Sequence, residues 1–175
     1  MNVAAGQFGH DFASEVERIL NETGLEPSKL KLEITESAFI KYGGSAEEAL
    51  ARLRSIGVEW SIDDFGTGYS SLSYLHRLQA NTVKIDRSFI SRIGGDPKGS
   101  EMVRAIIALA LNLGMDVVAE GVETIEQVVE LQALGCDRAQ GFYFSCAVDL
   151  LAADHLIASQ PWREEAACEI SDSSV

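Results

Sequence analysis

The chain has 175 residues, and its 27 acidic and 14 basic side chains give it a formal net charge of −13 at pH 7. This excess of acid repels polyanions, so DNA, RNA and anionic membrane surfaces are excluded as partners. Apolar residues make up 46% of the chain and charged residues 23%, which is typical of a globular protein with a buried core. We therefore expect one folded domain.

No targeting or membrane-spanning segment is predicted. Asp11, Glu15 and Glu17 interrupt the N-terminal region where a signal peptide needs an apolar run. The longest apolar run, residues 105–111, is far too short to cross a bilayer. The cysteines are odd in number and form no Cys-x-x-Cys pair, which indicates free thiols and a cytoplasmic location. They are Cys136, Cys146 and Cys168.

Short β-prone runs alternate with stretches in which apolar residues recur every three or four positions, a pattern typical of βα units. The predicted strands are residues 1–5, 30–34, 58–62, 82–85, 115–119 and 138–141. The predicted helices are residues 11–21, a helix opened by a Ser45–Glu48 capping box and ended by Gly57, residues 70–78, residues 99–113, a helix opened by a Thr124–Gln127 capping box, and residues 149–158. Six such units predict an α/β fold with a mainly parallel sheet, closed into a barrel or open and doubly wound.

Charged and amide side chains gather at the carboxyl ends of the predicted strands, where α/β folds place their ligand crevices. These residues are Glu33, Asp63, Asp64, Lys84, Asp86, Glu120 and Gln140. Carboxylates that meet there from several strands repel one another unless cations lie between them. Oxygen ligands in this number suit Mg²⁺ or Mn²⁺ and not zinc.

Lys84 is predicted to point to the interior of the fold. It alternates with two apolar residues of its strand, so it faces away from the helices that cover them. An unpaired ammonium is costly there, and Lys84 therefore needs a carboxylate or a phosphate nearby. Asp86 lies on the same side of the predicted strand and is one candidate.

The residues that follow the third predicted strand have structural interpretations as well. Asp63 and Asp64 could form a turn and cap the helix predicted after it. Gly66 and Gly68 could let backbone amides approach a phosphate at a helix start, although a glycine pair alone is a weak signal.

A series of motifs in order gives a more specific indication. The motifs are NV (2–3), QF (7–8), LEITES (32–37), IDDFGTGYSSL (62–72), VKID (83–86), AEGVET (119–124) and QGFYF (140–144). With these motifs the chain resembles the EAL domain, a family of bacterial phosphodiesterases that hydrolyse the second messenger cyclic di-GMP. The resemblance covers residues 2–156.

The resemblance implies a fold and a reaction. The fold is a modified (β/α)₈ barrel of the TIM type, here incomplete with about six βα units. Residues 1–160 form the EAL domain, and the acidic, serine-containing composition beyond Trp162 separately predicts a disordered tail at residues 161–175. The reaction is attack on one phosphodiester of cyclic di-GMP by a metal-activated water, which gives linear pGpG, with two Mg²⁺ or Mn²⁺ ions as cofactors.

The resemblance also implies roles for individual residues. The first metal is bound by Asn2, Glu33 and Asp63, and the second by Asp63 and Asp64. Lys84 orients the water and stabilises charge at phosphorus, and Glu120 is a base or a ligand of the second metal. The supporting and ligand-contacting residues are Glu36, which braces the glycine-rich loop, Asp86, Glu123, Gly66, Thr67 and Gln140.

Two departures from the family pattern shape the functional expectations. The family's Glu-Ala-Leu motif lies on the first barrel strand and its glutamate binds the first metal, whereas Glu48-Ala49-Leu50 lies within a predicted helix. Such a barrel needs about 250 residues, so we expect the first two βα units to be missing. Cys146-Ala147 also stands where the family has a basic residue and a proline.

Three functions remain open at this point. The first is a phosphodiesterase completed by an N-terminal segment or a partner, with little activity in the isolated chain. The second is a catalytically impaired module that binds cyclic di-GMP, and the third is a protein-interaction module. Unpaired strand edges predict a homo-oligomer unless a further segment completes the barrel. Outside the family, an open α/β phosphoacceptor also uses an Asp pair, Mg²⁺ and a lysine, but there the Asp pair follows the first strand.

Overall fold

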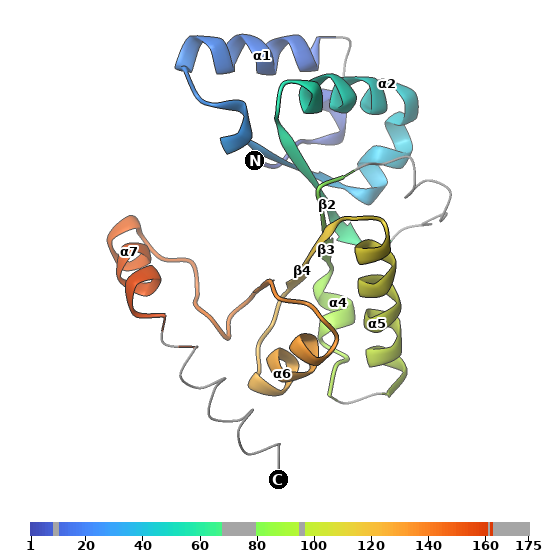
Figure 1. The fold of residues 1–175 in the computed structure, drawn as a ribbon, viewed down its shortest axis with the longest axis vertical. Helices are drawn as coiled ribbons and strands as arrows, with labels where there is room; N and C mark the ends of the chain where they lie inside the picture. Colours follow the sequence, from blue (N-terminus) through green and yellow to red (C-terminus); the bar gives the residue numbers. More distant parts are fainter. Residues whose placement is uncertain (9–10, 68–79, 95–96, 161, 163–175) are drawn as a thin grey trace. The chain divides into compact units, whose positions relative to one another are not determined.

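The computed structural model describes residues 1–8, 11–67, 80–94, 97–160 and 162 (Figure 1). Its contacts divide the chain into two compact units. The first contains Met1–Lys84 and Ala110–Asp116, and the second contains Ile85–Leu109 and Val117–Val175. The helix predicted at 70–78 and, apart from Trp162, the predicted tail lie outside the described residues, so both stay predictions.

The first unit contains the N-terminal helices and strands. Its elements are η1 (Ala5–Gln7), α1 (Phe12–Thr23), η2 (Pro27–Lys29), β1 (Lys31–Thr35), α2 (Glu36–Ser55), β2 (Glu59–Phe65) and β3 (Thr82–Ile85), whose last residue falls in the second unit. β1 and β2 pair in parallel, with Glu33 opposite Ser61 and Thr35 opposite Asp63.

Alternation along β1 separates the core of this unit from its polar face. Leu32 and Ile34 are fully buried, whereas the residues between and beside them are partly exposed. The ring of Trp60 on β2 stacks on Phe39 of α2, with ring centroids 5.9 Å apart. Because side chains of a strand alternate between its two faces, this packing places Glu33 on the face away from the core.

Two predictions near the N-terminus are only partly met. The strand expected at residues 1–5 is reduced to one bridge between Asn2 and Glu33, followed by η1. α2 begins at Glu36 with Thr35 as its N-cap, and it joins two helical segments across a kink at Gly43. The second segment follows this kink, close to the helix start predicted at Ser45, but Ser45 is not described as its cap. The Ser45 hydroxyl instead donates to the carbonyl of Tyr42. Thr35 accepts from the amide of Ala38, so the helix starts as soon as β1 ends.

The second unit contains the C-terminal elements. They are α4 (Arg87–Ile90), α5 (Pro97–Asn112, ending in the first unit), β4 (Asp116–Glu120, starting there), α6 (Ile125–Ala133), β5 (Ala139–Gln140) and α7 (Leu150–Ser159). β4 and β5 pair in parallel, with Glu120 opposite Gln140. The capping box of α6 is confirmed. The Thr124 hydroxyl accepts a hydrogen bond from the backbone amide of Gln127, and the Gln127 side-chain oxygen accepts one from the backbone amide of Thr124.

The predicted α/β fold is confirmed. Among the described residues, strand order follows chain order from β1 to β5. This is the order that successive βα units produce. The short helix α4 was not predicted, because four residues are too few for an apolar period to show. None of the helices in the described part of the chain is long and apolar enough to span a membrane.

Gly141, directly after β5, allows the closest backbone approach described in the second unit. A Cβ atom built there would overlap the backbone N, C and O atoms of Val122. Two hydrogen bonds hold Val122 in this position. The amide of Val122 donates to the carbonyl of Gln140 (3.1 Å), and the carbonyl of Val122 accepts from the amide of Tyr143 (3.0 Å).

We expect Gly141→Ala to lower the free energy of unfolding by about 1–3 kcal/mol or more, because the added methyl forces the backbone apart. Urea unfolding followed by circular dichroism measures this. Gly44→Ala is the matched control, since a Cβ there meets no described atom within 4 Å. Equal stabilities of the two variants would contradict the close approach.

The two described cysteines differ in environment. Cys136 is buried before β5, and burial raises the pKa of its thiol. Cys146 is exposed. Because the thiolate is the reactive form, a raised pKa and burial together slow alkylation.

We expect iodoacetamide to modify Cys146 in the native chain at least about tenfold faster than Cys136. Peptide mass spectrometry distinguishes the two sites from each other and from Cys168. Unfolding in urea should abolish the difference. Equal native rates would show that Cys136 is accessible.

Candidate functional site

Three charged side chains from three strands of the first unit converge. Glu33 comes from β1, Asp63 from β2 and Lys84 from β3. Lys84 Nζ lies 3.3 Å from Glu33 Oε2 and 3.1 Å from Asp63 Oδ1. The side chain of Lys84 is only 10% exposed, against 28% for Glu33 and 18% for Asp63. The prediction that Lys84 points inward and needs a carboxylate is therefore confirmed.

The described carboxylates that meet Lys84 are Glu33 and Asp63, whereas the described role of Asp86, the candidate named from the sequence, is a different one. β3 ends at Ile85, and Asp86 is the N-cap of α4. Its Oδ1 accepts a hydrogen bond of 2.9 Å from the amide of Ser88. The strand alternation that was expected to place Asp86 beside Lys84 stops one residue too early.

One oxygen of this group is not fully satisfied. Asp63 Oδ1 is buried and accepts no hydrogen bond from any described residue. Lys84 Nζ lies within ion-pair distance of it, but the contact lacks the alignment of a hydrogen bond. Buried acceptors are almost always paired, so this oxygen is available to a further electrophilic partner. The residues present thus fit a divalent cation, which binds carboxylate oxygens.

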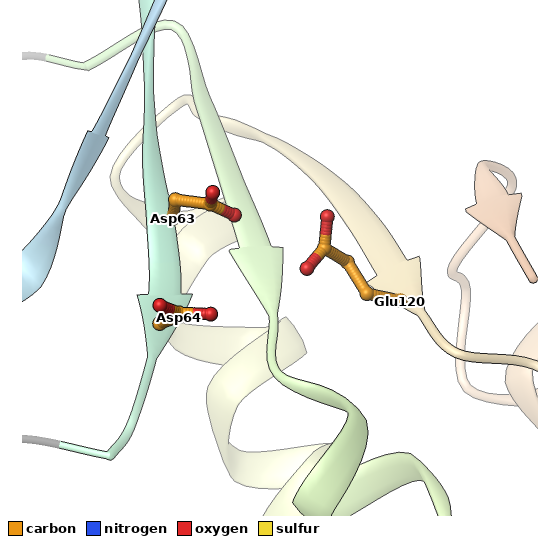
Figure 2. Close-up of side chains that lie close together, drawn as sticks. All are labelled: Asp63, Asp64 and Glu120. Carbon is orange, nitrogen blue, oxygen red and sulfur yellow. The ribbon is translucent and has the colours of Figure 1, made fainter. Parts of the chain in front are cut away.

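Asp64 presents a second carboxylate next to the first. Consecutive strand residues normally point to opposite faces. Asp64, however, has a φ of 53°, in the left-handed region that non-glycine residues rarely adopt. Figure 2 shows the carboxylates of Asp63 and Asp64 on the same side of β2, and oxygens of the two lie within 4.8 Å of each other. The backbone conformation of Asp64 therefore doubles the negative charge on one face of the strand.

The predicted strand 58–62 was too short, which changes the interpretation of the Asp pair. β2 runs from Glu59 to Phe65, so both aspartates are strand residues, and the turn begins only at Gly66. This turn is held from two sides. Thr67 donates from its amide and its hydroxyl to the carbonyl of Asp64, at 3.3 and 2.8 Å.

Glu36, to which the resemblance gives a supporting role, contacts the turn from the other side. This first residue of α2 is only 5% exposed. Its Oε2 accepts a 3.0 Å hydrogen bond from the amide of Gly66, whose φ is 95°. A charged acceptor from α2 thus fixes the turn that follows Asp63 and Asp64.

Asn2 is placed beside β1 by its backbone. The amide of Val3 donates to the carbonyl of Glu33 (2.9 Å), and the amide of Glu33 donates to the carbonyl of Met1 (2.8 Å). These bonds put Asn2 next to Glu33, the strand residue with which the sequence grouped it.

The second unit holds the remaining candidates. Glu120 is the last residue of β4 (Figure 2), and Gln140 is the last residue of β5. Gln140 Nε2 donates to Glu120 Oε1 at 2.8 Å, which fixes the orientation of that carboxylate. The expected place of Gln140 at the edge of the site stays a prediction, but its contact with Glu120 is direct.

Arg87 and Gln127 were missed as parts of this region. Arg87 Nη2 pairs with Glu123 Oε1 at 3.0 Å, and a Cβ on Gly121 would overlap the side chain of Arg87. Gln127 donates to the carbonyl of Ile90 (3.2 Å). These contacts join α4 to the loop that follows Glu120. The sequence did offer one signal for this ion pair. Arg87 directly follows the VKID motif, and the loop after β4 contains the acidic residue Glu123.

We expect Glu36→Ala to lower the free energy of unfolding by about 1–3 kcal/mol, because it leaves the amide of Gly66 without its described acceptor. Urea unfolding checks this. The control is Glu48→Ala in the same helix, where the side chain is exposed and the change should stay within about 0.5 kcal/mol. A Glu36→Ala variant as stable as the control would show that the turn does not depend on this bond.

Comparisons with known proteins match this chain to one family. Residues 1–147 match the sequence model described as "EAL domain". The cyclic di-GMP phosphodiesterase NbdA of Pseudomonas aeruginosa is 42% identical over 158 residues, which cover 90% of this chain and 20% of that protein. The chain spans about a fifth of the length of the curated relatives it matches.

Two solved structures are similar to the chain as well. The phosphodiesterase MucR of Pseudomonas aeruginosa, in complex with cyclic di-GMP, superposes with a TM-score of 0.81 at 43% identity, over 87% of this chain and 62% of that one. A manganese and cyclic di-GMP complex of BlrP1 from Klebsiella pneumoniae superposes with a TM-score of 0.77 at 34% identity, over 83% of this chain and 38% of that one.

Proposed function

Because this chain belongs to the EAL domain family, we propose that it binds cyclic di-GMP and hydrolyses it to linear pGpG with a divalent cation. The observation that carries the proposal is the buried Oδ1 of Asp63, which accepts no described hydrogen bond beside a second carboxylate and a buried ammonium. NbdA is named as a phosphodiesterase of cyclic di-GMP, and MucR is solved with this nucleotide bound. Residues 1–160 form the proposed domain.

The proposed cofactor is Mg²⁺ or Mn²⁺, at two sites. Asn2, Glu33 and Asp63 would hold the first, and Asp63 and Asp64 would hold the second. The carboxylates supply the hard oxygen donors that these ions prefer. A bound divalent cation lowers the pKa of water and neutralises charge that develops on phosphate oxygens. The BlrP1 complex contains manganese together with the nucleotide, which supports this choice.

The chain's own residues supply orientation and charge. Lys84, held between two carboxylates, stabilises the negative charge at phosphorus and orients the attacking water. Glu120 accepts a proton or binds the second cation, and its Oε1 is oriented by Gln140. The residues that support the loops or contact the nucleotide are Glu36, Gly66, Thr67, Asp86, Glu123 and Gln140.

The proposal includes the chain's surroundings. We infer a reducing, cytoplasmic location in a bacterium, which the free thiols of Cys136 and Cys146 support. We also infer that the chain works as a homo-oligomer or with a further segment of the barrel. Large apolar side chains on α7 support this inference, because Leu150 and Leu151 are 78% and 81% exposed.

The purified chain should bind cyclic di-GMP, and its own activity should be low and should yield pGpG only when Mg²⁺ or Mn²⁺ is present. Asp63→Asn should lower the rate by about a hundredfold or more, because it removes a carboxylate proposed to bind both cations. Chromatography of the nucleotides measures conversion, and calorimetry with Ca²⁺ measures binding. Asp11→Asn, an exposed position before α1, is the control and should leave the rate unchanged.

Each outcome has a definite meaning for this proposal. Binding without conversion would replace the enzyme by a cyclic di-GMP-binding module. Absence of both binding and conversion would leave a protein-interaction role and overturn the proposal. Conversion that survives Asp63→Asn would show that the site lies elsewhere.

A further inference from the structure

Resting on the proposed function, we propose that Lys84 is the built-in counter-ion of the cation site. Its ammonium lies against both Glu33 and Asp63, and a divalent cation binds by displacing the ammonium from Asp63 Oδ1. Cation and ammonium thus compete for one oxygen, and the affinity of the chain for the cation is set partly by Lys84.

The charges of the group show why a counter-ion is needed. Two carboxylate oxygens lie within 3.3 Å of one ammonium nitrogen, so a single positive charge faces two negative ones. Lys84 as a whole is only 8% exposed, and water therefore screens these charges weakly. Without Lys84, two partly buried carboxylates would face each other uncompensated, which proteins tolerate poorly.

The two contacts of Lys84 differ in kind. Nζ donates a hydrogen bond to Glu33 Oε2, whereas its contact with Asp63 Oδ1 does not have hydrogen-bond alignment. The ammonium can therefore leave Asp63 without breaking a directed bond and remain anchored on Glu33. The oxygen it leaves is buried, has no other described donor, and belongs to the carboxylate proposed to serve both cations.

The exchange also explains why the site combines a lysine with carboxylates. A divalent cation brings two positive charges to the position that one ammonium held. The displaced ammonium stays within the same pocket of negative charge, on the side of Glu33. From there it can meet an anionic phosphate.

Another lysine of the same unit provides a matched control. Lys31 Nζ pairs with Glu59 Oε2 at 3.7 Å and donates to Thr82 Oγ1 at 2.7 Å. Lys31 is the first residue of β1 and Thr35 is the last. Thr35 pairs with Asp63 of β2, so Lys31 lies at the far end of β1 from Asp63. Its removal takes away the same charge and the same kind of ion pair without touching Asp63.

Calorimetry with Mn²⁺ on the wild-type chain, Lys84→Met and Lys31→Met tests the proposal. We expect the Kd of Lys84→Met to fall by about tenfold or more, because the competing charge is gone. Lys31→Met should stay within about twofold of the wild type, since the Lys31 side chain is 38% exposed and water screens its charge. Mn²⁺ should also raise the Tm of Lys84→Met by more than that of the wild type. An unchanged or higher Kd in Lys84→Met would overturn the proposal.

A measurement on the wild-type chain decides the matter even if Lys84→Met does not fold. Acetic anhydride labels free amines, and peptide mass spectrometry compares Lys84 with Lys31 in one digest. We expect saturating Mg²⁺ to increase labelling of Lys84 relative to Lys31, and unchanged or reduced labelling would overturn the proposal. If neither the wild type nor Lys84→Met binds Mn²⁺, the metal site of the proposed function fails as well. If both bind it equally, only the counter-ion role fails.

Discussion

The ion pairs of Lys84 are the interaction on which the polar face of the first unit depends. β1, β2 and β3 each bring one charged side chain to a place where water is scarce, and the three are compatible only because two are negative and one is positive. The parallel register of β1 and β2 sets the positions of Glu33 and Asp63 along the strands. Electrostatics and strand pairing therefore support the same geometry.

A second constraint acts at the end of β2. The left-handed backbone at Asp64 is unfavourable for a residue with a side chain, and its cost of about 1–3 kcal/mol must be offset nearby. The hydrogen bonds of Thr67 and Glu36 to the turn provide such compensation. As a result of this backbone conformation, two consecutive carboxylates face the same side of the strand (Figure 2). Strain at this point is consistent with a functional site.

Local features of the chain were predictable because their causes are local. The alternation of Leu32, Glu33 and Ile34 and the capping box of Thr124 both follow from residues within one turn or one strand. The helix predicted from Ser45 is present, but it follows an earlier helical segment that Thr35 caps, and the two join across a kink at Gly43, where φ is 41°. A capping motif cannot indicate by itself whether the helix has already begun.

The sequence by itself determined the α/β fold, the family and the residues with which the chain can do chemistry, since motif order and strand periodicity are properties of the chain. Only the tertiary structure decided which charges meet. Lys84 is 51 residues from Glu33 and was expected beside Asp86, but strand pairing brought Glu33 and Asp63 to it instead. Likewise, only the folded backbone shows Asp64 turned to the side of Asp63. Pairing between distant strands and a strained φ angle depend on contacts that no short stretch of sequence contains.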